Sequence, residues 1–236
     1  MSPAIQSPAP DPRDEDFTLP KLRLEIRDLS HPGSSIFLSA VHASGVLASA
    51  VRNVLRCLYL SPSCPATTLP PTRSVTLILR DMDGVAYTTG SDLDDDHKEI
   101  HFSTRYIAGI TPDARRTDEI TGVLTHELVH CFQYNGRGHC PGGLIEGIAD
   151  WVRLRCHLAP PHWKREAGDK WDAGYQTTAY FLDYLEGRFG DGTVPRLNET
   201  LRTDRYGEKV TWDAVVGRTV EDLWSEYTAS LKDEKR

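Results

Sequence analysis

The sequence predicts a single α+β domain in which a small mixed β-sheet packs on a central helix and the C-terminal part is mainly helical. Two observations support this class: β-type patterns are confined to the first half of the chain, and patterns of helical period dominate from residue 117 onward. The 236 residues are enough to bury one substantial core. We find no internal repeat, and we assign residues 1–19 to a disordered tail and residues 20–236 to one domain.

The composition limits the function classes. Hydrophobic residues make up 39% and charged residues 26% of the chain, which is typical of a soluble globular protein. The net charge of −7 argues against a nucleic-acid partner, which would require clustered Lys and Arg. No apolar run approaches the roughly 20 residues that cross a bilayer, so we expect no membrane partner.

The N-terminal residues and the cysteines bear on the compartment. The opening residues contain neither the basic nor the apolar region of a signal peptide, which predicts a cytoplasmic location. The five cysteines show no tight paired framework, and we expect free thiols. Cys57 and Cys64 flank a proline-containing turn and could pair in an oxidising compartment.

Strand patterns precede the helical region. Residues 22–27 alternate apolar and charged side chains, which predicts a strand with one buried face. Residues 75–79 are almost wholly apolar and suit a central strand. The acidic segment 81–97 is predicted to be a solvated loop, because its aspartates do not have the spacing of an EF-hand. Residues 99–103 predict a short edge strand.

Helices are expected on both sides of the strand region. After a turn at residues 31–34, a long helix is predicted from Val41 to about Leu60, followed by a proline-rich loop. Further helices are predicted at about residues 174–187, 194–203 and 220–232.

The most informative helix is predicted at residues 117–134. Thr117 is its expected N-cap, and Asn135-Gly136 is a strong stop signal. Its apolar residues recur at helical spacing and form one face: Ile120, Val123, Leu124, Leu128 and Phe132.

A different face of this helix carries His126 and His130. Because positions i and i+4 lie on the same side of an α-helix, both imidazoles can bind one metal ion. Glu127 lies beside them, where a carboxylate can polarise a metal-bound water. This is the H-E-x-x-H arrangement of zinc peptidases, although surface helices also carry the pattern by chance.

A catalytic zinc ion usually has three protein ligands and one open position. Glu146 and Asp150 are four residues apart in a second predicted helix, residues 144–158, which a loop rich in Gly and Pro allows to fold back. In the gluzincin group such a helix supplies a glutamate ligand, and an acidic residue four positions later bonds a ligand histidine. We therefore expect Glu146 to be the third ligand and Asp150 to hydrogen-bond one of the ligand histidines. The alternatives are Asp150 as third ligand and His139, displaced by three residues from the metzincin position.

Two runs of sequence carry a resemblance to a known family. Residues 126–136, HELVHCFQYNG, and residues 141–150, PGGLIEGIAD, together resemble the plant and microbial basic secretory protein family. Residues 174–182 are similar to the segment that follows the active site in that family. The resemblance spans about residues 22–201.

This resemblance implies a zincin-like fold and a zinc metallopeptidase that acts on peptides or proteins. It implies one Zn²⁺ per chain, with His126 and His130 as ligands and Glu127 as catalytic base; the assignment of Glu146 also draws on the gluzincin pattern. The family name implies secretion, whereas this chain is acidic and has no recognisable secretion signal.

The expected reaction is peptide hydrolysis by a metal-activated water, with Glu127 as general base. The peptide is expected to pair with the edge strand at residues 99–103. Candidates for the oxyanion donor are Tyr175, Tyr180 and His162, and Tyr175 is preferred because it opens the helix after the site. The alternative functions are a zincin-fold metalloenzyme or metal-binding protein with a non-peptide substrate, and a plain helical protein with incidental histidines.

Overall fold

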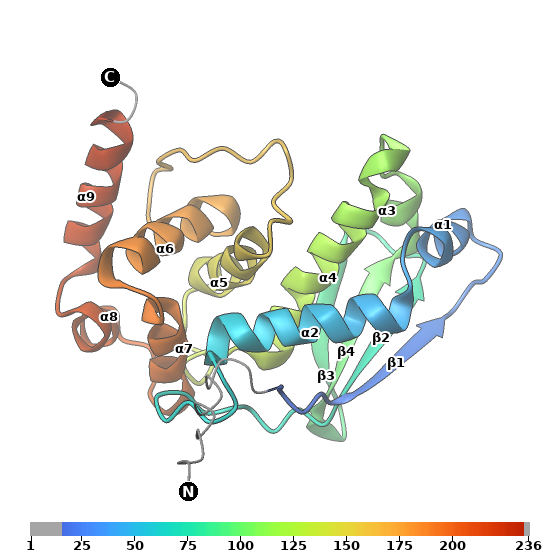
Figure 1. Ribbon diagram of the computed structural model, residues 1–236, viewed down its shortest axis with the longest axis horizontal. Coiled ribbons are helices and arrows are strands. Elements are labelled where there is room, and N and C mark those ends of the chain that lie inside the picture. The colour runs from blue at the N-terminus through green and yellow to red at the C-terminus, as the bar shows by residue number, and fades with distance from the viewer. Residues whose placement is uncertain (1–15, 234–236) are drawn as a thin grey trace, which may run out of the picture.

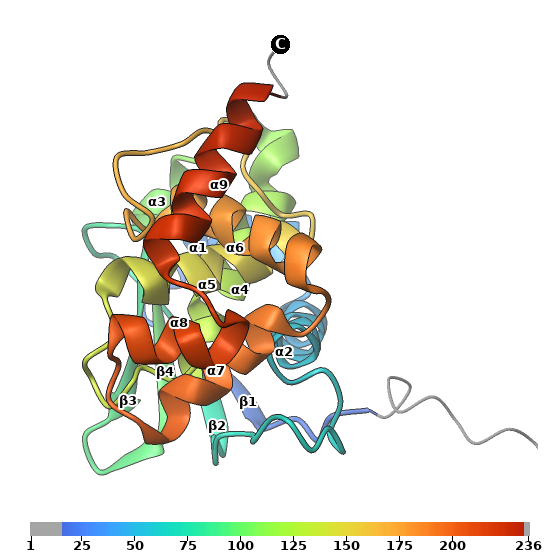
Figure 2. The same cartoon turned by 90° about the vertical axis from the view of Figure 1, so that its left-hand side faces the viewer.

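The computed structural model describes residues 16–233. Within this range, helices α2 (Ala43–Tyr59) and α4 (Arg116–Phe132) pack against one face of a four-stranded β-sheet (Figure 1). Helices α8 (Glu208–Val216) and α9 (Val220–Asp233) lie on the side of the molecule away from the sheet, nearest the viewer in Figure 2. The combination is the α+β class that the sequence predicts.

The tail expected at residues 1–19 falls mostly outside the described residues. In the part of it that is described, Phe17 is only 4% exposed and packs in the hydrophobic core. One cluster of buried side chains extends from Phe17 to Leu231, so sheet and helices share a single core.

The sheet has the order β1-β2-β4-β3. Strands β1 (Lys21–Ile26), β2 (Ser74–Arg80) and β4 (Asp94–Ser103) run parallel, and β3 (Ala86–Ser91) is antiparallel to β4. β2 lies inside the sheet and is largely buried, as its apolar sequence predicts. β1 alternates exposed and half-buried residues, as predicted for a strand with one buried face.

The edge strand differs from the prediction. Residues 99–103 belong to β4, which lies between β2 and β3, so they are not at the edge. The edge strand beside β4 is β3, inside the segment 81–97 that was predicted to be a loop, and the other edge is β1. The prediction was wrong because β3 and the start of β4 have no apolar alternation. Their pairing comes from a hairpin instead, and nearby cations such as Arg73 and Lys98 form ion pairs with the hairpin's aspartates.

Helix α1 (Pro32–Ala40) occupies the region where a turn was predicted. The His31 side chain accepts a hydrogen bond from the backbone N–H of Gly33, at 3.0 Å, and caps the helix. A Cβ at Gly33 would lie 2.0 Å from the carbonyl oxygen of Thr104, the first residue of α3 (Thr104–Ala108). A glycine is therefore required for α1 to approach α3.

Helix α2 covers the sheet with its apolar face. Its buried residues are Leu47, Ala50, Val51, Val54, Leu55, Leu58 and Tyr59. In the described part of the chain, no single helix combines the length and apolar character needed to cross a membrane. Helices α1 and α2 meet this test only as a pair, bent by 68°.

The later helices follow the predicted order. They are α5 (Gly142–Arg155), α6 (Tyr175–Phe189), α7 (Thr193–Thr203), α8 and α9, and only α8 falls where no helix was predicted. Helix α4 begins at Arg116, with Arg115 as N-cap residue, so the prediction that Thr117 caps it was wrong. The Thr117 hydroxyl instead donates to the carbonyl of Ala40, at 3.0 Å, and ties α4 to the end of α1.

Two glycines allow α5 to pack closely on its surroundings. A Cβ at Gly143 would lie 1.8 Å from the carbonyl oxygen of Asp172, and one at Gly147 would lie 2.2 Å from the Thr178 methyl group. Thr178 cannot easily move, because its hydroxyl accepts from Gly174 N–H and donates to the Trp171 carbonyl. The position of α5, and of its acidic residues, therefore depends on these glycines.

Gly147→Ala is expected to lower the free energy of unfolding by about 1–3 kcal/mol, because the added methyl group overpacks the α5–α6 contact. Chemical denaturation of the purified variant measures this change. The matched control is Gly187→Ala in α6, where no atom lies within 4 Å of the added Cβ. That variant is expected to be unchanged or stabilised by about 0.5–1 kcal/mol. Equal effects of the two substitutions would contradict the packing argument.

Candidate active site

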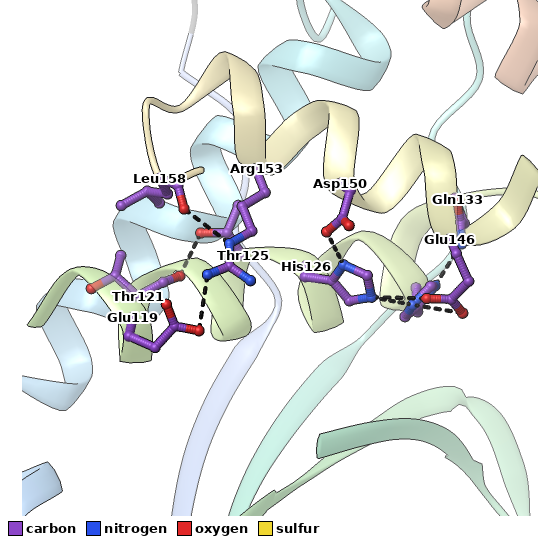
Figure 3. A network of polar contacts seen from close by, with 10 residues as sticks. Glu119, Thr121, Thr125, His126, Gln133, Glu146, Asp150, Arg153 and Leu158 are labelled. Carbon is purple, nitrogen blue, oxygen red and sulfur yellow. Dashed lines mark hydrogen bonds and ion pairs between the residues drawn. The ribbon is translucent and has the colours of Figure 1, made fainter. Parts of the chain in front are cut away.

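Helices α4 and α5 run in opposite directions and face each other along successive turns (Figure 3). His130 of α4 lies beside Glu146 of α5, and one turn earlier on α4, His126 lies beside Asp150. A further turn along α5 brings Arg153 against the start of α4. The i, i+4 spacing within each helix thus becomes a row of cross-helix contacts.

Two imidazoles and one carboxylate converge on one point. The Nε2 atoms of His126 and His130 are 3.2 Å apart. Glu146 places one carboxylate oxygen 3.1 Å from His126 Nε2 and the other 3.7 Å from His130 Nε2. One ligand atom from each residue lies within 4.8 Å of the others. This set of nitrogen and oxygen donors fits a zinc ion with three protein ligands.

The other two candidates for third ligand lie elsewhere. The Asp150 carboxylate is 2.6 Å from Nδ1 of His126, on the far side of the ring from Glu146, and Asp150 is only 2% exposed. There it can hold the ring with Nε2 directed toward Glu146, as a supporting carboxylate does at zinc sites. His139 is exposed and contacts Arg205, at 3.3 Å from its Nδ1, and it does not line the active-site cleft.

Gln133 supports the second histidine. Its side-chain amide nitrogen is placed 2.6 Å from Nδ1 of His130, while its amide oxygen is buried without a hydrogen-bond partner. Rotating the amide by half a turn lets the oxygen accept from Nδ1–H and leaves the His130 Nε2 lone pair directed at Glu146. Gln133 therefore holds the ring of His130 through Nδ1, as Asp150 holds the ring of His126. Its i+3 spacing from His130 was the only sequence signal.

The charged groups of the site shift one another's pKa values. Burial lowers the pKa of His126, but its hydrogen bonds to Asp150 and Glu146 outweigh burial and raise the pKa to about 9. Burial, followed by the charge of His126, lowers the pKa of His130 to about 4. Burial raises the pKa of Glu146, but the hydrogen bond from His126 and the charges of His130 and His126 together more than offset it, so the pKa is lowered overall.

Glu127 is held from the sheet. It is 6% exposed, and the hydroxyl of Thr88, on edge strand β3, lies 2.7 Å from its carboxylate and 2.9 Å from its backbone carbonyl. Burial raises the pKa of Glu127, and the His126 charge and the Thr88 hydrogen bond offset only part of that shift. No sequence pattern pointed to Thr88, because the contact joins residues 39 positions apart and its strand was predicted to be a loop.

The site opens into a cleft of about 1050 Å³. Residues 85–88 of the β3 region form one wall, and α4, α5 and the start of α6 form the others. Tyr175 is the first residue of α6; its φ is 47° and the residue is 60% exposed. Its ring is nearly parallel to that of His126, with the ring centroids 6.5 Å apart. The Glu146 charge and burial raise the pKa of Tyr175, which keeps its hydroxyl protonated as a donor. His162 also lines the cleft, whereas Tyr180 does not.

Comparisons with known proteins support the family resemblance. Neither the curated proteins nor the solved structures compared with this chain gave a match. A family model described as "Peptidase of plants and bacteria" matches residues 19–227, which includes every residue of the site described above. The match covers well over half of the chain and confirms the resemblance to the basic secretory protein family. The chain belongs to this family of peptidases of plants and bacteria.

Proposed function

We propose that the protein is a zinc-dependent metallopeptidase with a zincin-like fold, and that His126, His130 and Glu146 bind one Zn²⁺ per chain. The observation that carries the proposal is the convergence of two imidazole Nε2 atoms and one carboxylate within 4.8 Å. The hydrogen bond that Asp150 accepts from Nδ1–H of His126 supports it further, because catalytic zinc sites use such carboxylates to orient their histidines.

In this mechanism the bound zinc ion supplies Lewis-acid activation of the attacking water and the scissile carbonyl. Glu127 accepts the proton of the water and delivers it to the leaving amine. Its burial and raised pKa bring its proton affinity closer to that required for this transfer. Thr88 fixes the direction of the carboxylate, and the protonated hydroxyl of Tyr175 is the proposed donor to the oxyanion.

The proposed substrate is an extended peptide that pairs with β3 rather than with residues 99–103. β3 is the edge strand on the side of the sheet next to the site, and residues 85–88 line the cleft with the histidines. An edge strand offers unpaired backbone N–H and C=O groups, so a peptide can add to it as a further strand. The volume of the cleft, about 1050 Å³, favours a peptide over a small compact substrate.

The proposal is tested by incubating zinc-loaded protein with a panel of unfolded proteins and peptides, beside Glu127→Gln. The wild type is expected to cleave peptides, and the variant to bind the same amount of zinc while losing about 10²–10⁴-fold in kcat. Mass spectrometry of the products and elemental analysis of zinc provide the two measurements. The absence of cleavage by zinc-loaded wild type, or full activity of the variant, would contradict the proposal.

Glu146→Ala is expected to weaken zinc binding by more than about tenfold, because it removes the carboxylate nearest both Nε2 atoms. Competition with a chromophoric chelator measures the dissociation constant. His139→Ala is the matched control, since His139 is exposed and contacts Arg205 instead. Normal affinity in Glu146→Ala, or weakened affinity in His139→Ala, would assign the third ligand elsewhere.

Thr88→Val is expected to lower kcat by about 10–100-fold, because a hydrogen bond to a charged group contributes about 1.5–3 kcal/mol. Valine keeps the shape of threonine and suits an edge strand. Thr88→Ser retains the hydroxyl and is expected to preserve most of the activity. If the two variants lose the same activity, the hydroxyl does not orient Glu127.

A further inference from the structure

One end of the cleft is lined by charged groups that the zinc site and Glu127 do not use. Arg153 lies one turn beyond Asp150 on α5, about 5 Å further along the helix axis. It packs against Gly122 of α4, one turn before His126, where a Cβ would lie 2.6 Å from its Nε. Glycine at this position lets the guanidinium lie against the backbone of α4, between Glu119 and His126 (Figure 3).

The guanidinium of Arg153 is fixed but not fully occupied. Arg153 is 7% exposed; its Nε donates to the Leu158 carbonyl, at 3.0 Å, and its Nη2 donates to Glu119, at 3.1 Å. The Trp163 ring covers it, with the centroid 5.6 Å from Cζ. Within residues 16–233, Nη1 has no hydrogen-bond partner, and it is not enclosed by protein. In Figure 3 this unbonded end lies on the side nearer His126.

The charge around Arg153 is positive on balance. One carboxylate oxygen of Glu119 accepts hydrogen bonds from Arg153 and from the Tyr106 hydroxyl, the latter at 2.9 Å. The other oxygen accepts a hydrogen bond from Arg115, at 3.2 Å. Burial raises the pKa of Glu119, but these partners more than offset it, so the carboxylate stays ionised. One carboxylate thus faces two guanidinium groups, and one positive charge remains at this end of the cleft. Its weak solvation makes attraction to an anion stronger than in water.

We propose that Arg153 forms a subsite for a carboxylate of the peptide substrate, within one or two residues of the cleaved bond. The inference rests on the proposed peptidase function and adds the class of peptide: one with an Asp or Glu side chain, or a chain-terminal carboxylate, at this position. A guanidinium with a free Nη1 edge is the side chain best suited to hold a carboxylate. Arg153 lies about one helical turn along the cleft from His126, and the length of that turn, about 5 Å, is the span of one or two residues of an extended peptide.

Matched fluorogenic peptides test the subsite. They carry Glu or Gln at each position near the cleaved bond, and each is made with a free and an amidated C-terminus, which separates the two sources of the carboxylate. For wild type, one Glu position or the free terminus is expected to raise kcat/KM about tenfold or more. Arg153→Gln is expected to remove this preference, because glutamine keeps a polar contact to Glu119 without the positive charge.

The ratio within each peptide pair separates recognition from folding. A loosened structure lowers cleavage of both members equally, whereas loss of the subsite changes their ratio. Arg155→Gln is the matched control, because Arg155 is a cation on the same helix that pairs with Asp183 and does not line the cleft, and it is expected to keep the ratio. A wild-type ratio near one, or an unchanged ratio in Arg153→Gln, would overturn the inference.

A binding measurement separates this inference from the peptidase proposal. Fluorescence anisotropy measures how tightly the labelled peptides bind to Glu127→Gln protein. It gives the ratio of affinities within each peptide pair without turnover. If carboxylate peptides bind about tenfold better and Arg153→Gln abolishes the difference, the subsite is supported even when wild type cleaves nothing, and only the proposed reaction fails. If neutral peptides are cleaved and no carboxylate preference appears in either assay, the subsite alone fails.

Discussion

The hydrogen bond between Asp150 and His126 is the contact on which the rest of the site depends. At 2.6 Å, and with both side chains withdrawn from solvent, it joins α5 to α4 and selects which nitrogen of His126 faces Glu146. A buried carboxylate without such a partner would be costly, so the contact also fixes how far the two helices can slide. The neighbouring pairs, Glu146 with His130 and Arg153 with Glu119, follow from the same antiparallel arrangement.

Close backbone packing holds this arrangement in place. Gly147 and Gly143 let α5 approach α6 and the segment before it, and Gly122 leaves room on α4 for the guanidinium of Arg153. The sheet contributes from the opposite side, where Thr88 reaches Glu127 from β3. The candidate site is therefore built from three directions, by elements whose other faces pack in the core. Such support is what keeps reacting groups in a fixed geometry.

The polar groups of the cleft divide it into two regions of different charge. Around His126 and His130, the carboxylates of Glu127, Glu146 and Asp150 provide negative charge suited to a divalent cation. One turn away, the contacts of Arg153 leave excess positive charge suited to an anion. The two regions share the α4–α5 contact, so the proposed metal site and the proposed substrate subsite depend on the same pair of helices. Membership of a peptidase family agrees with a cleft organised in this way.

The sequence by itself determined the motif helix, the helix that follows it and the placing of His126 and His130 on one face, because i, i+4 spacing is a local property. Glu146 was preferred to Asp150 and His139 only on the gluzincin pattern, because its approach to the histidines joins two helices. It also placed β1 and β2, whose apolar patterns are strong. Only the tertiary structure decided the edge strand, the contact of Thr88 with Glu127 and the position of Arg153 in the cleft. Each of these joins segments far apart in the chain, and their pairing depends on packing and hydrogen bonds that no local pattern encodes.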